Sequence, residues 1–104
     1  MEKAFCMKIE ILRSALDDLA AGRIFYDGQG EGIGAYFASC MFAEIDSLAL
    51  LAGMHRIVGG HHRIITRRFP YAIYYKKSGG TVVVHRILDC RRNPEWIAGA
   101  LRGG

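Results

Sequence analysis

The sequence predicts an α+β domain in which a helical hairpin packs on one face of a small, mainly antiparallel sheet. Three observations indicate this class. Residues 7–12 alternate between apolar and polar, as in a half-buried strand. Two segments with helical spacing of apolar residues then flank a glycine-rich run, and from residue 62 onward β-branched segments are joined by short turns. The expected order is β-α-α-β-β-β with a short C-terminal helix, in one domain that covers residues 1–104.

A first helix is expected from Ser14 to about Tyr26. Ser14 and Asp17 have the spacing of a capping box, in which the hydroxyl and the carboxylate each satisfy a free backbone N–H group. Asp17 and Asp18 would then lie in the first turn, where the helix dipole favours negative charge. The residues that recur at helical spacing are Leu16, Leu19, Arg23 and Tyr26.

The run DGQGEGIG at residues 27–34 carries four glycines. A nucleotide-binding loop would follow a strand, open a helix and carry a lysine near its end. This run follows a helix, lacks the lysine and contains two acids, so it predicts a turn between antiparallel helices instead. The second helix should span Gly34 to Ala52. Its apolar stripe consists of Ile33, Phe37, Cys40, Met41, Ile45, Leu48 and Leu51.

The remaining chain reads as strands at residues 63–66, 71–75 and 81–88. Strands with such short connections must be antiparallel. Asn93 suits a helix N-cap and Pro94 a first helical position, so a short helix should reach about Leu101. Both long helices precede the three strands and should cover one face of the sheet, leaving the other partly open. The side chains expected on or beside that open face are Arg63, Tyr71 or Tyr74, Arg86, Arg91 and Arg92.

Composition narrows the function classes. The formal charge of +4 and the pI of about 9.2 mildly favour an anionic partner. The three cysteines share no CxxC spacing and are expected to be buried free thiols in a reducing compartment. His61 and His62 are adjacent and would point to opposite faces of a strand, so neither a metal site nor a cofactor is expected. No apolar run suggests a signal peptide or a membrane span, which predicts a soluble cytoplasmic protein.

Four segments resemble landmarks of the RelE/ParE toxins of bacterial toxin–antitoxin systems, in the usual order. They are SALDDLAAG, IDSLALLAG, RRFPYAIYY and VVVHRILDCRRNP. The last two are the most specific, and the likeness covers nearly the whole chain. The chain resembles the ParE branch best, whose members are often described as plasmid stabilization proteins.

The RelE branch implies a ribosome-dependent messenger RNA endonuclease, with basic residues for the phosphate and a C-terminal tyrosine for proton transfer. This sequence keeps little of that set. Ile65 and Ala72 occupy positions where relatives carry basic residues, and only Trp96 or Ile97 lies near the tyrosine position. A divergent ribonuclease would have to use Arg63, His85, Arg86 and Arg92.

The ParE branch implies a toxin that arrests growth by binding DNA gyrase, without a catalytic centre. Tyrosine and arginine suit such a contact surface, because they combine large area with directed hydrogen bonds. The expected contacts are Arg67, Arg68, Tyr71, Arg91 and Arg92. The alternative for these residues is structural: Tyr71 and Tyr75 would be core residues, and the arginines would form a solvated edge.

The resemblance also implies a cognate antitoxin that wraps the domain and neutralises it. Three functions therefore remain open: a gyrase-binding toxin, a ribonuclease acting on the ribosome with messenger RNA, and an inactive relative that only binds a partner. Fold alone does not decide between them.

Overall fold

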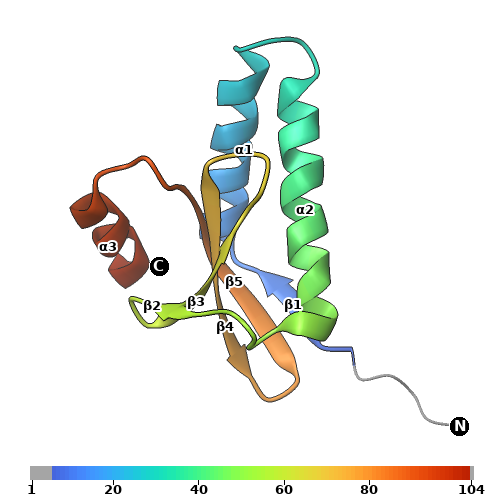
Figure 1. Cartoon of the computed structure of the whole chain (residues 1–104), viewed down its shortest axis with the longest axis vertical. Helices are drawn as coiled ribbons and strands as arrows, with labels where there is room; N and C mark the ends of the chain where they lie inside the picture. Colours follow the sequence, from blue (N-terminus) through green and yellow to red (C-terminus); the bar gives the residue numbers. More distant parts are fainter. Residues whose placement is uncertain (1–5, 104) are drawn as a thin grey trace, which may run out of the picture.

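The computed structural model describes residues 6–103. A long helical hairpin covers one face of a five-stranded sheet, and a short helix packs on the other face (Figure 1). The helices are α1 (Arg13–Asp27), α2 (Ile33–Leu51) and α3 (Pro94–Gly103), and the strands are β1 (Lys8–Ile11), β2 (Ile57–Val58), β3 (His61–Ile65), β4 (Tyr71–Ser78) and β5 (Thr81–Asp89). The predicted α+β class and hairpin are confirmed.

The strand order in the sheet is β1-β5-β4-β3-β2. The strands from β2 to β5 are antiparallel to their neighbours, whereas β1 pairs in parallel with β5. The connector expected after α2 contains the additional short strand β2, which pairs with the first two residues of β3. A bulge in the β4–β5 pairing shifts the register between Tyr74 and Tyr75.

The main core lies between the helical hairpin and the sheet. Alternate residues of β4 and β5 point toward the hairpin, as the two-residue period of a strand requires. The side chains that fill this layer include Leu19, Phe37, Met41, Ile45, Leu48, Ile64, Ile73, Tyr75, Val82, Val84 and Ile87. The predicted stripe of α2 is confirmed at its centre, although Leu51 is exposed.

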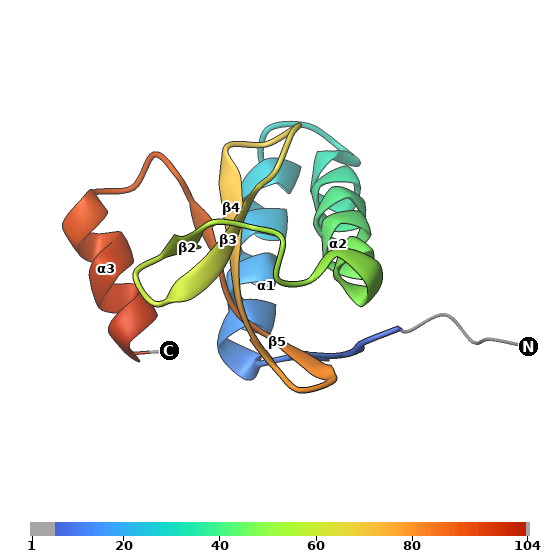
Figure 2. The same cartoon turned by 60° about the horizontal axis from the view of Figure 1, so that its bottom comes forward.

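The opposite face of the sheet is less open than expected. Helix α3 packs Leu101 against Ala72, Tyr74 and Leu88 in a second, smaller core cluster. Figure 2 shows α3 and the two long helices on opposite sides of the sheet. Asn93 caps α3 as predicted, since its side-chain oxygen accepts the Glu95 N–H at 2.7 Å.

The capping box predicted for α1 is wrong. The N-cap position is Leu12, and Ser14 lies inside the helix, where its hydroxyl donates to the carbonyl of His85 at 2.7 Å. No acidic residue lies in the first turn of α1, because Asp17 and Asp18 come one turn later. The hydroxyl is thus a tether between α1 and β5 rather than a helix cap.

The buried face of α1 agrees with the prediction at Leu19 and Tyr26 and differs from it by one residue at two positions. Leu16 and Arg23 are exposed, and Ala15 and Gly22 take their places in the interior. Small residues are needed here because α1 lies close to its neighbours: a Cβ atom on Gly22 would lie 2.6 Å from the Phe37 ring. Close packing of the hairpin therefore depends on residues that a hydrophobicity pattern does not detect.

The turn between α1 and α2 is confirmed as a helix–helix connection. Asp27 closes it, because its carboxylate accepts the Gly34 N–H at 2.9 Å. Gly32, at φ 84°, adopts the left-handed conformation that favours glycine. Asp27, one of the two acids in this run, thus stabilises the hairpin turn.

Two other expectations need correction. Cys6 and Cys90 are exposed, so the expectation of buried thiols is wrong for these two, whereas Cys40 is partly buried and packs against the main core. By length and composition alone α2 could cross a membrane, contrary to the sequence-based expectation. One such helix is weak support for a span, since a core helix meets the same criteria and α2 contributes Phe37, Met41 and Leu48 to the core.

Candidate interaction site

The residues named for a ribonuclease lie mainly on the α3 side of the sheet. Arg63, Tyr74 and Arg86 are cross-strand neighbours on β3, β4 and β5. Burial raises the pKa of Tyr74, and a hydrogen bond from Arg63 opposes that shift. The register therefore brings two of the expected basic residues to one face, on either side of a buried tyrosine.

Arg86 is held by the protein itself. Its guanidinium donates to both oxygens of Asp18, at 2.7 and 2.9 Å, and to the Ala100 carbonyl of α3 at 3.2 Å. The Asp18 carboxylate also accepts the Ile87 N–H at 2.9 Å, on the edge of β5 beyond its pairing with β1. Arg86 thus joins α1, β5 and α3, and the hydrogen bond to Asp18 raises its pKa further.

His85 lies beside His61, with ring centroids 4.8 Å apart in an edge-to-face arrangement. His61 is buried. Its Nδ1 lies 3.3 Å from the Gly59 carbonyl, and its Nε2 has no partner among the described residues. Burial lowers the pKa of His61, and the charges of His85 and Lys76 act in the same direction. This pair forms a ring contact between β3 and β5, the two strands that flank β4.

Tyr71 lies in an aromatic cluster between the hairpin and the sheet. Its ring centroid is 4.8 Å from that of Phe37 and 6.1 Å from that of Tyr26, and Phe69 completes the cluster. Only 8% of Tyr71 is exposed, and burial raises its pKa to about 12. The ring is therefore part of the core, which was the structural alternative to a contact role for Tyr71. Its hydroxyl reaches a cavity.

That cavity, of about 300 Å³, lies between α1, the end of β5 and the start of α3. Arg92 and Trp96 form one wall, with the Arg92 guanidinium 3.7 Å above the Trp96 ring. The other lining residues are Asp18, Ala21, Gly22, Phe25, Tyr71, Ile87, Leu88 and Asp89.

Arg91 lies beside this cavity in an exposed ion pair. Its guanidinium donates to both oxygens of Asp89, at 2.7 and 3.0 Å, and this hydrogen bonding lowers the pKa of Asp89. The paired arginines therefore have different surroundings. Arg91 is engaged by a carboxylate, whereas Arg92 forms no ion pair within residues 6–103.

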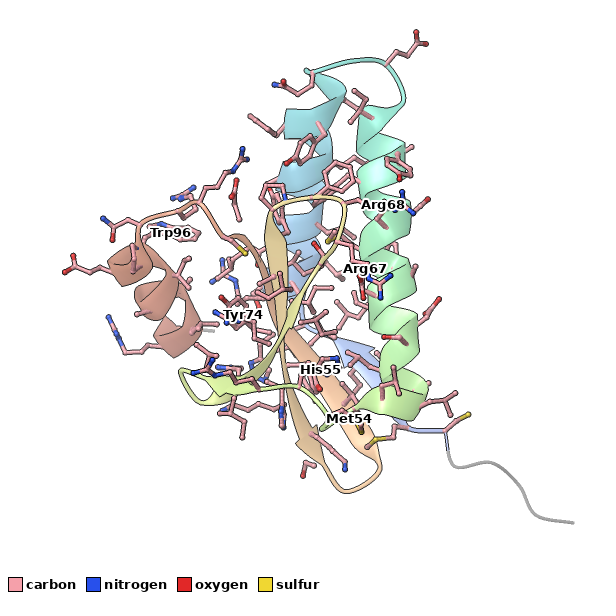
Figure 3. The ribbon with its side chains drawn as sticks, viewed as in Figure 1. Met54, His55, Arg67, Arg68, Tyr74 and Trp96 are labelled. Atoms are coloured by element: carbon pink, nitrogen blue, oxygen red, sulfur yellow. The ribbon has the colours of Figure 1, made fainter. Side chains whose placement is uncertain are left out.

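Arg67 and Arg68 lie on a different surface. They are exposed in the β3–β4 loop and line a cavity of about 510 Å³ between α2 and β3 (Figure 3). Neither arginine forms an ion pair in the part of the chain that the structure describes. The rest of this cavity combines apolar and polar groups, namely Cys40, Ala43, Glu44, Ser47, Leu51, His55, Ile64, Ile65 and Thr66.

The residues expected to contact a target therefore form two groups. Tyr71 and Arg92 share the cavity beside α3, next to Arg91, whereas Arg67 and Arg68 line the cavity beside α2. Sequence reasoning missed Asp18 and Trp96. The position of Trp96, a few residues after an arginine pair, could have indicated the stacking contact, because arginine frequently stacks on tryptophan. No local pattern revealed that Asp18 would meet Arg86, which is 68 residues away in sequence.

The connector after α2 is pinned by a histidine–tyrosine network. The Tyr75 hydroxyl accepts the Gly53 N–H at 2.9 Å and lies 2.6 Å from Nδ1 of His55. His62 stacks on the Tyr75 ring, and its Nδ1 lies 2.7 Å from the His55 carbonyl. The Tyr75 hydroxyl is therefore satisfied, as expected for a core tyrosine. Among the described residues, no cluster of three His, Cys, Asp or Glu side chains could hold a metal ion.

No protein-family model and no curated protein sequence matches this chain. A solved structure does match, described as the chromosomal ParDE TA system from P. aeruginosa. The match has a TM-score of 0.71 at 19% identity and covers 81% of this chain and 96% of that one. The chain therefore has the ParE-like fold that the sequence resemblance implied.

Proposed function

We propose that this chain is the toxin of a type II toxin–antitoxin system and acts by binding a protein target, DNA gyrase in the first instance. The likeness to a chain of the ParDE structure supports the toxin assignment. The same likeness supports an antitoxin partner, whereas the plasmid-stabilization role is proposed from the sequence resemblance alone.

The state of Arg86 is the observation that carries the choice of binding over cleavage. A phosphate-binding arginine must present its N–H groups to the substrate. Arg86 instead directs its guanidinium to Asp18 and to the Ala100 carbonyl. Arg92, which was also named for a ribonuclease, lines the cavity between α1 and the start of α3. Its guanidinium stacks there on the ring of Trp96.

The exposed arginines suit recognition of a protein. Arg67 and Arg68 line a cavity of mixed apolar and polar character, and the Arg92 guanidinium stacks on an aromatic ring. Arginine and aromatic side chains are enriched among the residues that dominate protein–protein affinity. The same two surfaces are available to an antitoxin, whose binding would then compete with the target.

The test compares two activities of the purified protein. Gyrase supercoiling and ribosome-dependent messenger cleavage are measured side by side, with and without the antitoxin encoded beside this chain. We expect supercoiling to be inhibited and messenger RNA to stay intact. Cleavage at normal gyrase activity would refute the proposal and favour the ribonuclease.

Variants then locate the contact. Replacing Arg67 and Arg68 together by Ala tests the α2 cavity, and Arg92→Gln tests the α3 cavity. Arg13→Ala is the matched control, because Arg13 is 83% exposed and makes only a 4.0 Å contact with Asp17. Loss of inhibition in either arginine variant, with Arg13→Ala unchanged, assigns the surface. An inactive member would leave growth and both assays unaffected while still binding the antitoxin.

A further inference from the structure

The cavity beside α3 contains hydrogen-bond donors that the protein does not use. Tyr71 is more than nine-tenths buried, and its hydroxyl forms no hydrogen bond within residues 6–103. The hydroxyl oxygen is not among the fully buried polar atoms without a partner, so it can be reached from the cavity that the residue lines. The Arg92 guanidinium lines the same cavity and forms no ion pair within residues 6–103.

The acids around this cavity are already satisfied. Asp18 accepts two hydrogen bonds from Arg86 and one from Ile87. Both carboxylate oxygens of Asp89 accept hydrogen bonds from the Arg91 guanidinium. Two carboxylates are therefore matched by two arginines, and Arg92 is the cation in excess. The cavity as a whole can still donate hydrogen bonds and accept one negative charge.

We propose that this cavity binds one carboxylate side chain, an aspartate or glutamate of a protein partner, between Arg92 and Tyr71. The planar guanidinium of Arg92 is held on the Trp96 ring, so its orientation is restricted before the ligand arrives. A carboxylate accepts two parallel N–H bonds from such a group and a third bond from a tyrosine hydroxyl. The source of the carboxylate rests on the proposed function, whereas the site itself does not.

The surroundings favour a protein carboxylate over a nucleic-acid phosphate. Phe25 and Trp96 are 50% and 40% exposed at the cavity, and they offer apolar contact to the stem of an acidic side chain. A nucleic-acid strand would bring several phosphates close to Asp18 and Asp89, which line the cavity, whereas a single carboxylate adds only one negative charge.

Trp96 provides a local measurement, because it is the single tryptophan of the chain. Its fluorescence is followed while propionate, which mimics the acidic side chain, is added at constant ionic strength. Dimethyl phosphate, a mimic of the nucleic-acid diester, is titrated in parallel. We expect a saturable change with propionate at millimolar concentration and a dissociation constant at least threefold higher for dimethyl phosphate.

Two variants test the donors separately. Tyr71→Phe removes only the hydroxyl and should weaken propionate binding about three- to tenfold, the loss expected for one hydrogen bond. Arg92→Gln should abolish the saturable change. Arg13→Gln, which changes an exposed arginine that lines neither cavity, should leave the titration unaltered. Circular dichroism confirms that each variant is folded.

The outcomes separate the site from the function. A titration without saturation, or one that Tyr71→Phe leaves unaltered in a folded protein, would overturn the inference. Equal or tighter binding of dimethyl phosphate would replace the protein carboxylate by a nucleic-acid phosphate. If propionate binds as expected while gyrase is unaffected, the site stands and the proposed target is refuted. If gyrase is inhibited but propionate does not bind, the proposed target stands and the carboxylate site is refuted.

Discussion

Replacing Asp18 by Ala tests whether Arg86 is a structural residue. The variant removes two charge-assisted hydrogen bonds to Arg86 and the acceptor of the Ile87 N–H group. The side chains of Arg86 and Asp18 are only 18% and 13% exposed, so water replaces these bonds poorly. Removing one member of a buried ion pair costs about 3–5 kcal/mol, because the other charge stays buried without a partner.

The expected loss is large compared with the total stability of a domain of this size, which is about 5–15 kcal/mol. Urea unfolding followed by circular dichroism measures it, with Asp17→Ala as the control. Asp17 lies next to Asp18 but is exposed, and its 4.0 Å contact with Arg13 should contribute less than about 0.5 kcal/mol.

A double-mutant cycle isolates the pair. Arg86→Met keeps much of the side-chain volume without the charge, and combining it with Asp18→Ala should cost less than the sum of the two single changes. If Asp18→Ala costs under about 1 kcal/mol, or if the cycle shows no coupling, Arg86 is not held as described. It would then be available to a phosphate, and the main argument for a binding function would fail.

Three further changes test other parts of the structure. Burial lowers the pKa of His61 in the folded protein, so as the pH falls the unfolded chain binds more protons than the folded one. The stability that neutral His61 contributes should therefore be present above about pH 6.5 and lost as the pH falls below that value. His61→Phe should therefore show a smaller drop in urea midpoint between pH 7.5 and 5.5 than the unmodified protein. Gly34→Ala should destabilise the hairpin by about 1–3 kcal/mol, because the new Cβ would collide with the Arg23 carbonyl and the Asp27 carboxylate, and thermal unfolding measures this loss. Tyr75→Phe should cost about 1–3 kcal/mol and speed amide exchange at Gly53, whose N–H loses its acceptor; unaltered exchange there would contradict the proposed anchoring role.

Local patterns predicted the elements of this fold because each element carries its own signal. The apolar stripe of α2 and the Asn93–Pro94 start of α3 depend on neighbouring residues in the sequence, and both were read correctly. The errors arose where a distant partner changed the role of a residue. Ser14 has the local pattern of a cap, yet the His85 carbonyl, 71 residues away, takes its hydroxyl.

The candidate site was less predictable for the same reason. Sequence patterns placed Arg86, Arg91 and Arg92 near one another, but they could not show which of them would meet a carboxylate. The fold gives Arg86 to Asp18 and Arg91 to Asp89. Only the packing of α3 shows that Arg92 stacks on Trp96 and forms no ion pair among the described residues.

This division among the arginines separates the proposed functions physically. Cleavage would require Arg86 to leave Asp18, which would expose the unpaired carboxylate beside the incoming phosphate and release the Ala100 carbonyl of α3. Binding through Arg92 requires no such rearrangement, because its guanidinium is already stacked on Trp96 and has no ion pair to break among the described residues. The binding function therefore uses the structure as it stands, and a ribonuclease would first have to break the Arg86–Asp18 ion pair between α1 and β5.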